Sequence, residues 1–213
     1  MGKKRQVARS PEDLSKKRDM ILDTAMTLLL DQGYTRTTMS DVAKAADIGR
    51  GTVYWHFPSK DGLFLALITR ETDIIRAALE PMATSPGPAL DAIDGLVQAS
   101  FQYYQEAAPF LKGLLSILGG AGEEMEQQLV AMMSDVYREY NQLVTNLLER
   151  GKAEGTVCQE LDSQVTAAAI IVILDAMFLQ ISFGLIPNDA DRLTKAITTL
   201  IHHGCTHSGV NDA

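Results

Sequence analysis

Residues 37–57 read TTMSDVAKAADIGRGTVYWHF, and this stretch decides how the rest of the chain is interpreted. Helical periodicity is present on both sides of Asp47-Ile48-Gly49. Two short helices can cross at a sharp angle only if a small residue lies at the crossing and the contacts are apolar, and Ala43 and Val42 meet these conditions. Asp47 falls where the turn needs a left-handed backbone, which aspartate tolerates better than most residues. The stretch therefore predicts a helix-turn-helix over residues 38–57.

The second short helix, about 50–56, is expected to lie in the major groove of DNA with its first side chains against the base edges. Arg50 can bond a guanine edge or a phosphate, and Gly51 permits close approach of the backbone. For Tyr54, Trp55 and His56, packing at the edge of the small core is the alternative to phosphate contact. The predicted DNA-binding residues are Thr37, Thr38, Arg50, Gly51, Thr52, Tyr54, Trp55, His56 and Lys60.

Outside this motif the helical pattern continues and no stretch alternates convincingly with period two, which predicts an all-α chain of about nine helices. Breaks at Gly33, at Pro81 to Pro88 and at Pro109 separate several of them. The predicted helices cover about 14–32, 38–46, 50–56, 59–80, 89–107, 109–118, 122–151, 162–185 and 189–203. The predicted organisation is a basic, disordered arm over 1–13, a three-helix DNA-binding domain over 14–60, a larger helical ligand-binding and dimerisation domain over 61–204, and a tail over 205–213.

Charge is distributed unevenly along the chain. The formal net charge is −8, yet residues 1–60 hold 11 Lys and Arg against 7 Asp and Glu, and residues 61–213 hold 8 against 20. A basic head on an acidic body favours one orientation on a polyanion, because the head attracts phosphates and the body repels them. This distribution is compatible with double-stranded DNA as a partner.

Residues 15–75 resemble the DNA-binding domain of the TetR family of bacterial regulators. The resemblance depends on many residue types at fixed offsets: Gly33-Tyr34, Thr37-Thr38, Val42-Ala43, Arg50-Gly51-Thr52, Tyr54-Trp55-His56-Phe57 and Lys60. The sequence Trp55-His56-Phe57 is similar to that of AcrR-type members, which repress multidrug efflux genes. Asp47 and Gly49 depart from the usual family pattern, and both are physically tolerable. The resemblance implies a repressor that a small, largely apolar ligand releases from a palindromic operator.

The last two predicted helices carry more apolar surface than one side of a monomer needs, which favours a two-fold homodimer. A dimer places two recognition helices about one DNA turn, or a multiple of it, apart. The expected interface is Ile171, Leu174, Met177, Ile181, Leu193, Ile197 and Leu200.

For the aromatic and methionine side chains of the middle helices, the first interpretation is that they pack in the core. The resemblance also implies an apolar cavity with a few polar groups such as Gln102 and Gln180. Asp175 attracts attention because a carboxylate within an apolar helix needs a cation, a hydrogen bond or a cationic ligand as partner. The expected pocket residues are Phe101, Tyr104, Met132, Tyr137, Asp175 and Phe178.

Other functions have less support from the sequence. A cluster at His202-His203 with Cys205 and His207 matches no closed zinc pattern, so neither metal nor cofactor is expected. No nucleophile elbow or phosphate-binding glycine loop is present, so an enzyme is the least favoured alternative, behind a helical ligand-binding protein that does not recognise DNA. Residues 165–185 approach the length of a membrane span, but Asp175 at their centre favours a buried helix. Only two cysteines and no secretory signal indicate the cytoplasm.

Overall fold

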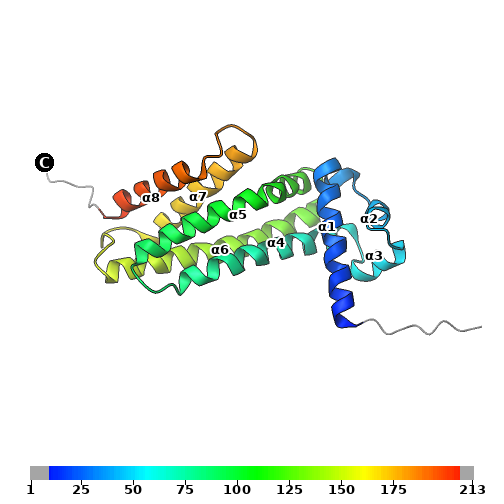
Figure 1. Cartoon of the computed structure of the whole chain (residues 1–213), viewed down its shortest axis with the longest axis horizontal. Coiled ribbons are helices and arrows are strands. Elements are labelled where there is room, and N and C mark those ends of the chain that lie inside the picture. The colour runs from blue at the N-terminus through cyan, green and yellow to red at the C-terminus, as the bar shows by residue number, and fades with distance from the viewer. Residues whose placement is uncertain (1–9, 207–213) are drawn as a thin grey trace, which may run out of the picture. The chain divides into compact units, whose positions relative to one another are not determined.

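The structure, a computed structural model, describes residues 10–206, apart from the side chains of residues 83 and 105–108 (Figure 1). Within this range every regular element is a helix, which confirms the all-α prediction. The arm predicted over 1–13 and the tail predicted over 205–213 fall largely outside the described residues. The helices are α1 (Pro11–Arg36), α2 (Met39–Ala45), α3 (Arg50–His56), α4 (Lys60–Ala83), α5 (Ala89–Leu118), α6 (Glu123–Ala153), α7 (Ser163–Ser182) and α8 (Ala190–Thr206).

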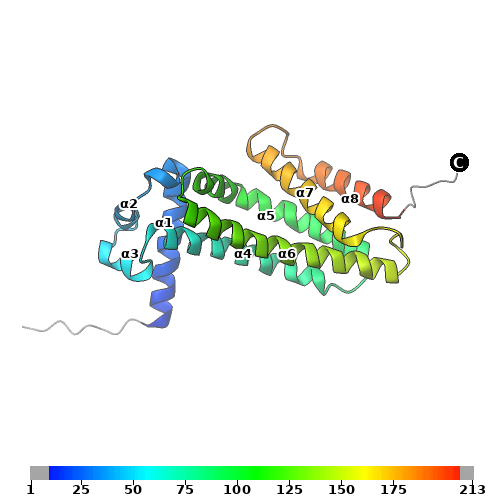
Figure 2. The ribbon, with the colours of Figure 1, turned by 180° about the vertical axis from the view of Figure 1, so that it is seen from behind.

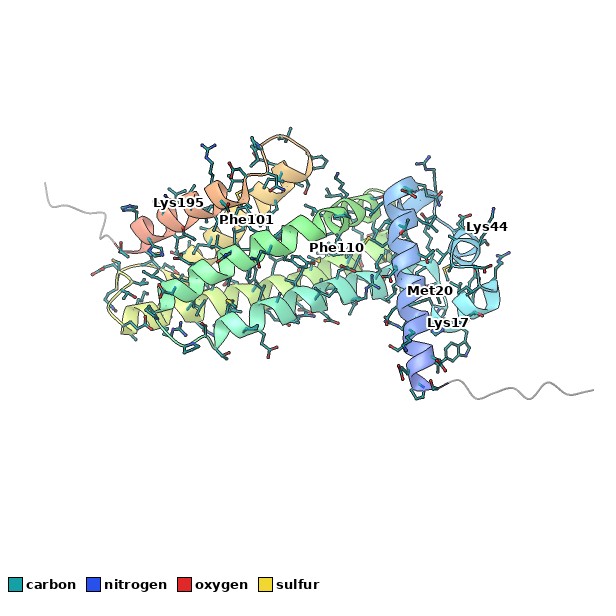
Figure 3. The ribbon with its side chains drawn as sticks, viewed as in Figure 1. Lys17, Met20, Lys44, Phe101, Phe110 and Lys195 are labelled. Atoms are coloured by element: carbon teal, nitrogen blue, oxygen red, sulfur yellow. The ribbon has the colours of Figure 1, made fainter. Side chains whose placement is uncertain are left out.

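Helix α5 replaces two helices that the sequence suggested at 89–107 and 109–118. Pro109 lies inside it rather than between two helices. A proline removes one hydrogen bond from a helix and crowds the preceding turn, which costs about 3 kcal/mol in an isolated helix. Packing offsets this cost here, because Phe101 and Phe110, which Figure 3 labels, are both buried on the two sides of the proline.

The chain forms two compact units. Residues 10–70 and 113–126 belong to the first, and residues 71–112 and 127–206 to the second. The chain therefore passes between the units three times, within α4, within α5 and within α6. Each crossing lies inside a helix and not in a loop.

The first unit is built around α1. Ser10 and Asp13 form a capping box at the start of this helix, and Gly33, with φ of 78°, interrupts its helical geometry near the end. Arg70 of α4 pairs with Asp23 of α1 at 2.7 Å. The core contains apolar residues of α1 together with apolar residues of α2 to α4, namely Ile21, Leu22, Ala25, Leu29, Val42, Ala43, Val53, Leu63, Phe64 and Leu67.

The second unit has its own apolar core, to which α5, α6, α7 and α8 contribute. Helices α7 and α8 lie side by side in both views (Figures 1 and 2), and the Cys158 amide before α7 donates to the Cys205 carbonyl in α8 at 2.8 Å. Asp162 caps α7 by accepting from the Gln164 and Val165 amides. Helix α7 is also the one described helix that is long and apolar enough to cross a membrane, a test that core helices of soluble proteins pass as well.

Candidate nucleic-acid interface and ligand site

Helix α2 begins at a complete capping box. The Asp41 amide donates to the Thr38 hydroxyl at 3.2 Å, and the Thr38 amide donates to the Asp41 carboxylate at 3.0 Å. These bonds satisfy donors that the first helical turn would otherwise leave open. The Thr38 hydroxyl also donates to the Asp41 carboxylate at 2.6 Å, and this bond together with that of the Thr38 amide lowers the pKa of Asp41 by stabilising the charged form.

The turn between α2 and α3 has the conformation that the sequence suggested. Asp47 has φ of 52°, the left-handed region, and the Ile48 amide donates back to the Ala43 carbonyl at 3.0 Å. Gly49 is the N-cap of α3 and supplies no side-chain cap. The helix-turn-helix predicted over 38–57 is thus present, with α3 as its second helix.

One face of α3 is open. Arg50, Gly51, Tyr54 and Trp55 are all exposed, Tyr54 at 44% and Trp55 at 64%. Residues three or four apart share a helix face, so these four form one surface, which we call the α3 face. Val53 on the opposite side is fully buried and fixes the helix to the core of the first unit. Large aromatic side chains left in solvent are usual where a protein meets a partner.

The remaining predicted contacts surround the α3 face. Thr38 is exposed at the start of α2, and Thr52 is half-buried. His56 is half-buried between the rings of Trp55 and Phe57, at centroid distances of 4.6 and 6.2 Å. Lys44, labelled in Figure 3, is an exposed basic residue of α2 that the sequence analysis did not single out.

Lys60 is held by its neighbours at the start of α4. Its ammonium lies 4.0 Å from the centre of the Tyr34 ring and donates to the Thr35 carbonyl at 3.3 Å. Partial burial lowers the pKa of Lys60, against the effect of the neighbouring Asp61 carboxylate. The Tyr34 hydroxyl donates to Asp61, and burial together with this bond raises the pKa of Tyr34. The sequence indicated Lys60 but not the tyrosine and carboxylate that hold it.

Thr37 differs from the other predicted contacts. Its side chain is 1% exposed, and its hydroxyl donates to the Gly33 carbonyl at 2.8 Å. Thr37 therefore closes the end of α1, and its hydroxyl is not available to a phosphate. Thr37 is consequently not part of the DNA-binding surface.

In the second unit a group of tyrosines surrounds Asp175. The Tyr104 hydroxyl donates to the Asp175 carboxylate at 2.9 Å, and Tyr137 donates to it as well. Burial raises the pKa of Asp175, and these two hydrogen bonds oppose the rise. Burial also raises the pKa of Tyr140 to about 12, although a hydrogen bond with Ser100 opposes this.

The walls of this cluster are aromatic. The Tyr104 ring stacks on Phe178 at 3.5 Å, and Phe101 meets Phe178 edge-on at 5.0 Å. Five of the six predicted pocket residues, all except Met132, are therefore joined by these contacts: Phe101, Tyr104, Tyr137, Asp175 and Phe178. Met132 is half-buried in α6. Ser100 and Tyr140 were not predicted, because a serine and a tyrosine in a helix carry no sequence pattern of their own.

A groove of about 310 Å³ lies next to this cluster, between α4 and α6. Arg76 of α4 crosses it to Glu139 of α6, with Nε 2.6 Å from the carboxylate, and also pairs with Asp73 at 3.0 Å. Its lining is Ile75, Arg76, Leu79, Glu80, Val136, Glu139, Tyr140 and Leu143. Tyr140 belongs to both the groove and the tyrosine cluster.

The apolar outer face of α7 and α8 differs from the predicted interface. Ile171, Leu174, Met177 and Ile197 are each less than 10% exposed and belong to the core of their own unit. Ile181 and Leu193 are half-buried against the same core, and only Leu200, at 66%, is open. The residues that are exposed instead define what we call the α7–α8 face: Val165, Val172, Ile173, Leu179 and Leu200.

The histidines near the C-terminus form no metal cluster within residues 10–206. The Nε2 atom of His202 lies 3.0 Å from the Asp94 carboxylate of α5, which gives this ring a structural partner. His207 lies outside the described residues.

The second helix of the helix-turn-helix has exposed basic and aromatic side chains, and the second unit has a polar cluster in an apolar core. Together these features define a DNA-binding regulator with a ligand-binding unit. Comparison with known proteins agrees. Residues 21–67 match the family described as bacterial regulatory proteins, tetR family. Residues 21–67 therefore form the DNA-binding domain of a regulator of this family.

Similarity to individual relatives is moderate. The transcriptional regulator AcrR of Shigella flexneri is 35% identical over 86 residues, which is only 40% of each chain. The transcriptional regulator TtgR of Pseudomonas putida is 25% identical over 88% of this chain and 89% of its own. Among solved structures, NalD of Pseudomonas aeruginosa, the secondary repressor of a multidrug efflux pump, has a TM-score of 0.72 at 20% identity, covering 92% of this chain and 99% of NalD. The last comparison establishes the fold.

Proposed function

We propose that this regulator is a repressor that binds a near-palindromic operator as a homodimer, through the α3 face of each chain. The observation that carries the proposal is the α3 face itself, where Arg50, Tyr54 and Trp55 stand in solvent while Val53 holds the helix from behind. An arginine at the start of such a helix can bond a guanine edge with both of its nitrogens. Thr38, Thr52, His56 and Lys60 surround this face and are suited to phosphates.

The α7–α8 face supports the homodimer. Val165, Val172 and Leu179 recur at seven-residue intervals, so they lie on one side of α7, and Leu200 of α8 is exposed as well. Monomeric soluble proteins rarely leave so extended an apolar surface open. A two-fold arrangement of α7 and α8 would cover it and place the two α3 helices for the two halves of a palindrome.

The experiment is a fluorescence-anisotropy titration of the DNA upstream of the protein's own gene. We expect Arg50→Ala to weaken binding at least tenfold, because a bidentate base contact contributes about 1–3 kcal/mol per site and a dimer makes two. Arg192→Ala is the matched control, because it removes the same charge from an exposed side chain of α8, which is 88% exposed. Equal losses in the two variants, or an affinity that does not fall with added salt, would contradict the proposal.

We also propose that a small-molecule effector of this regulator binds against the cluster around Asp175. A ligand that fits only a conformation with the wrong spacing of the α3 helices would shift the population away from the DNA-binding state. An Asp175→Asn variant should then show an altered effector response, and an unchanged one would exclude Asp175 from the site.

The alternatives are less favoured. A ligand-binding protein without DNA recognition would have no use for an exposed arginine and two exposed aromatic residues on α3. The relatives are transcriptional regulators and not enzymes. A bacterial operator lies in the cytoplasm, which is the location that we propose for the protein.

A further inference from the structure

The groove between α4 and α6 is apolar inside and acidic at its edge. Its walls are aliphatic, from Ile75 and Leu79 on α4 and from Val136 and Leu143 on α6. Its volume of about 310 Å³ is at the lower end of the range for small-molecule sites. Aliphatic walls of this kind favour the hydrocarbon part of a ligand.

The charges at the edge do not balance. Arg76 is the only cationic side chain among the described residues of the lining, and it already pairs with Asp73 and Glu139. Glu80 also lines the groove, one helical turn beyond Arg76, and its side chain makes no ion pair within residues 10–206. The described lining therefore holds two carboxylates, Glu80 and Glu139, against one guanidinium, which also pairs with Asp73 outside the lining. The nearby Arg138 is already paired with Asp135 at 2.9 Å.

A further carboxylate acts on one residue of the lining. Tyr140 lines the groove, and the charge of Asp175 acts on the Tyr140 hydroxyl. The partners of Asp175 are hydroxyl groups, which do not neutralise a carboxylate. An anion in the groove would be repelled by these carboxylates, whereas a cation would be attracted by them.

We propose that the groove between α4 and α6 binds a monovalent organic cation with an aliphatic body. The cationic head lies at the edge between the carboxylates of Glu80 and Glu139, and the aliphatic body lies against Ile75, Leu79, Val136 and Leu143. The inference names the chemical class of an effector and therefore depends on the proposed function only for its effect on DNA, because binding itself can be measured without DNA.

A cation in this position competes with Arg76 for Glu139. The Arg76–Glu139 pair is a direct side-chain link between α4 and α6, and its two side chains are 39% and 58% exposed. A partly exposed ion pair is worth little, so a bound ligand can displace it at low cost. Removing Arg76 should consequently strengthen cation binding, the opposite of the effect of removing Glu80.

The experiment is isothermal titration calorimetry of the full chain, without DNA, with three probes of the same eight-carbon body. The probes are octyltrimethylammonium, octanesulfonate and octanol, each used below its micellar or solubility limit. We expect the cation to bind, the alcohol to bind more weakly and the anion not to bind. Glu80→Gln should weaken binding of the cation by about three- to fivefold, as expected for the loss of a partly exposed ion pair. Arg76→Gln should strengthen binding of the cation by a similar factor.

Asp135→Asn is the matched control, because it removes the same charge from an exposed position of α6 outside the groove. It should leave the affinity for the cation unchanged. Equal or tighter binding of octanesulfonate would overturn the proposal, as would a Glu80→Gln effect no larger than that of Asp135→Asn. Glu80 is exposed, so its replacement does not endanger folding. If the cation binds as expected but does not alter operator binding in a separate anisotropy titration, the groove proposal stands and the effector role fails.

Discussion

Replacing Val172 by aspartate is expected to separate the proposed homodimer into monomers. Val172 is 64% exposed in the single chain, whereas the adjacent Ile171 is 4% exposed. Burying a whole valine side chain gains about 1.5–3 kcal/mol, so covering the exposed part gains roughly 1–2 kcal/mol. Two-fold symmetry brings two copies together, so the loss is roughly 2–4 kcal/mol per dimer. An uncompensated carboxylate in an apolar contact adds to this cost.

A loss of this size weakens the dimer by roughly 30-fold to nearly 1,000-fold in Kd. Sedimentation velocity across the micromolar range measures it directly. Val130→Asp in α6 is the matched control, since Val130 is 53% exposed but lies outside the α7–α8 face. If the Val172→Asp protein dimerises like the unmodified chain, or if Val130→Asp dissociates equally, the assignment of the interface is refuted.

Three further substitutions test the structure. Gly51→Ala adds a Cβ atom that meets nothing within 4 Å, so the thermal unfolding temperature should rise with a gain of about 0.5–1 kcal/mol, while operator affinity should fall if DNA covers this face. Gly113→Ala places its Cβ 2.7 Å from a methyl group of Leu29, and this overpacking should lower stability by about 1–3 kcal/mol in denaturant unfolding; an unchanged midpoint would contradict that contact. Burial raises the pKa of Asp175, so the folded state binds a proton on this carboxylate more tightly than the unfolded state does. The folded state therefore loses stability as the pH rises from the ordinary pKa of aspartate through the raised pKa of Asp175. Asp175→Asn should therefore stabilise the chain at pH 7, with a gain that shrinks as the pH falls toward the ordinary pKa of aspartate, and a gain independent of pH would count against a buried carboxylate.

The helix-turn-helix was predictable because its constraints are local. The left-handed residue at Asp47, the cap at Thr38 and the small residue at Ala43 all act within a few positions of one another. Thr37 and Thr38 carry the same side chain but have different roles. Thr38 is the exposed N-cap of α2, whereas Thr37 is the C-cap of α1, where its hydroxyl donates to the Gly33 carbonyl four residues earlier. The pair Thr37-Thr38 in the sequence does not show which of the two closes the preceding helix.

The interface was harder to predict because α7 is apolar on nearly every side. Ile171 and Val172 are adjacent and chemically alike, yet one is buried in the core and the other is exposed. A sequence with polar residues on one side of a helix reveals which side is buried, and α7 offers little of this contrast. For Pro109 the difficulty was similar, because the apolar packing that keeps α5 continuous involves residues distant in sequence.

The passage of the chain between its two units inside α4, α5 and α6 has a practical consequence for protein engineering. A protease that cuts extended loops would not separate the two units, because the chain passes between them only within helices. A chimera that combined the DNA-binding unit of this chain with the ligand-binding unit of a relative would need three splice points, each inside a helix. Each residue gained or lost there would rotate everything beyond it by about 100°, because an α-helix completes one turn in about 3.6 residues. Functional hybrids should therefore arise from exchanges that preserve helical phase at all three joins.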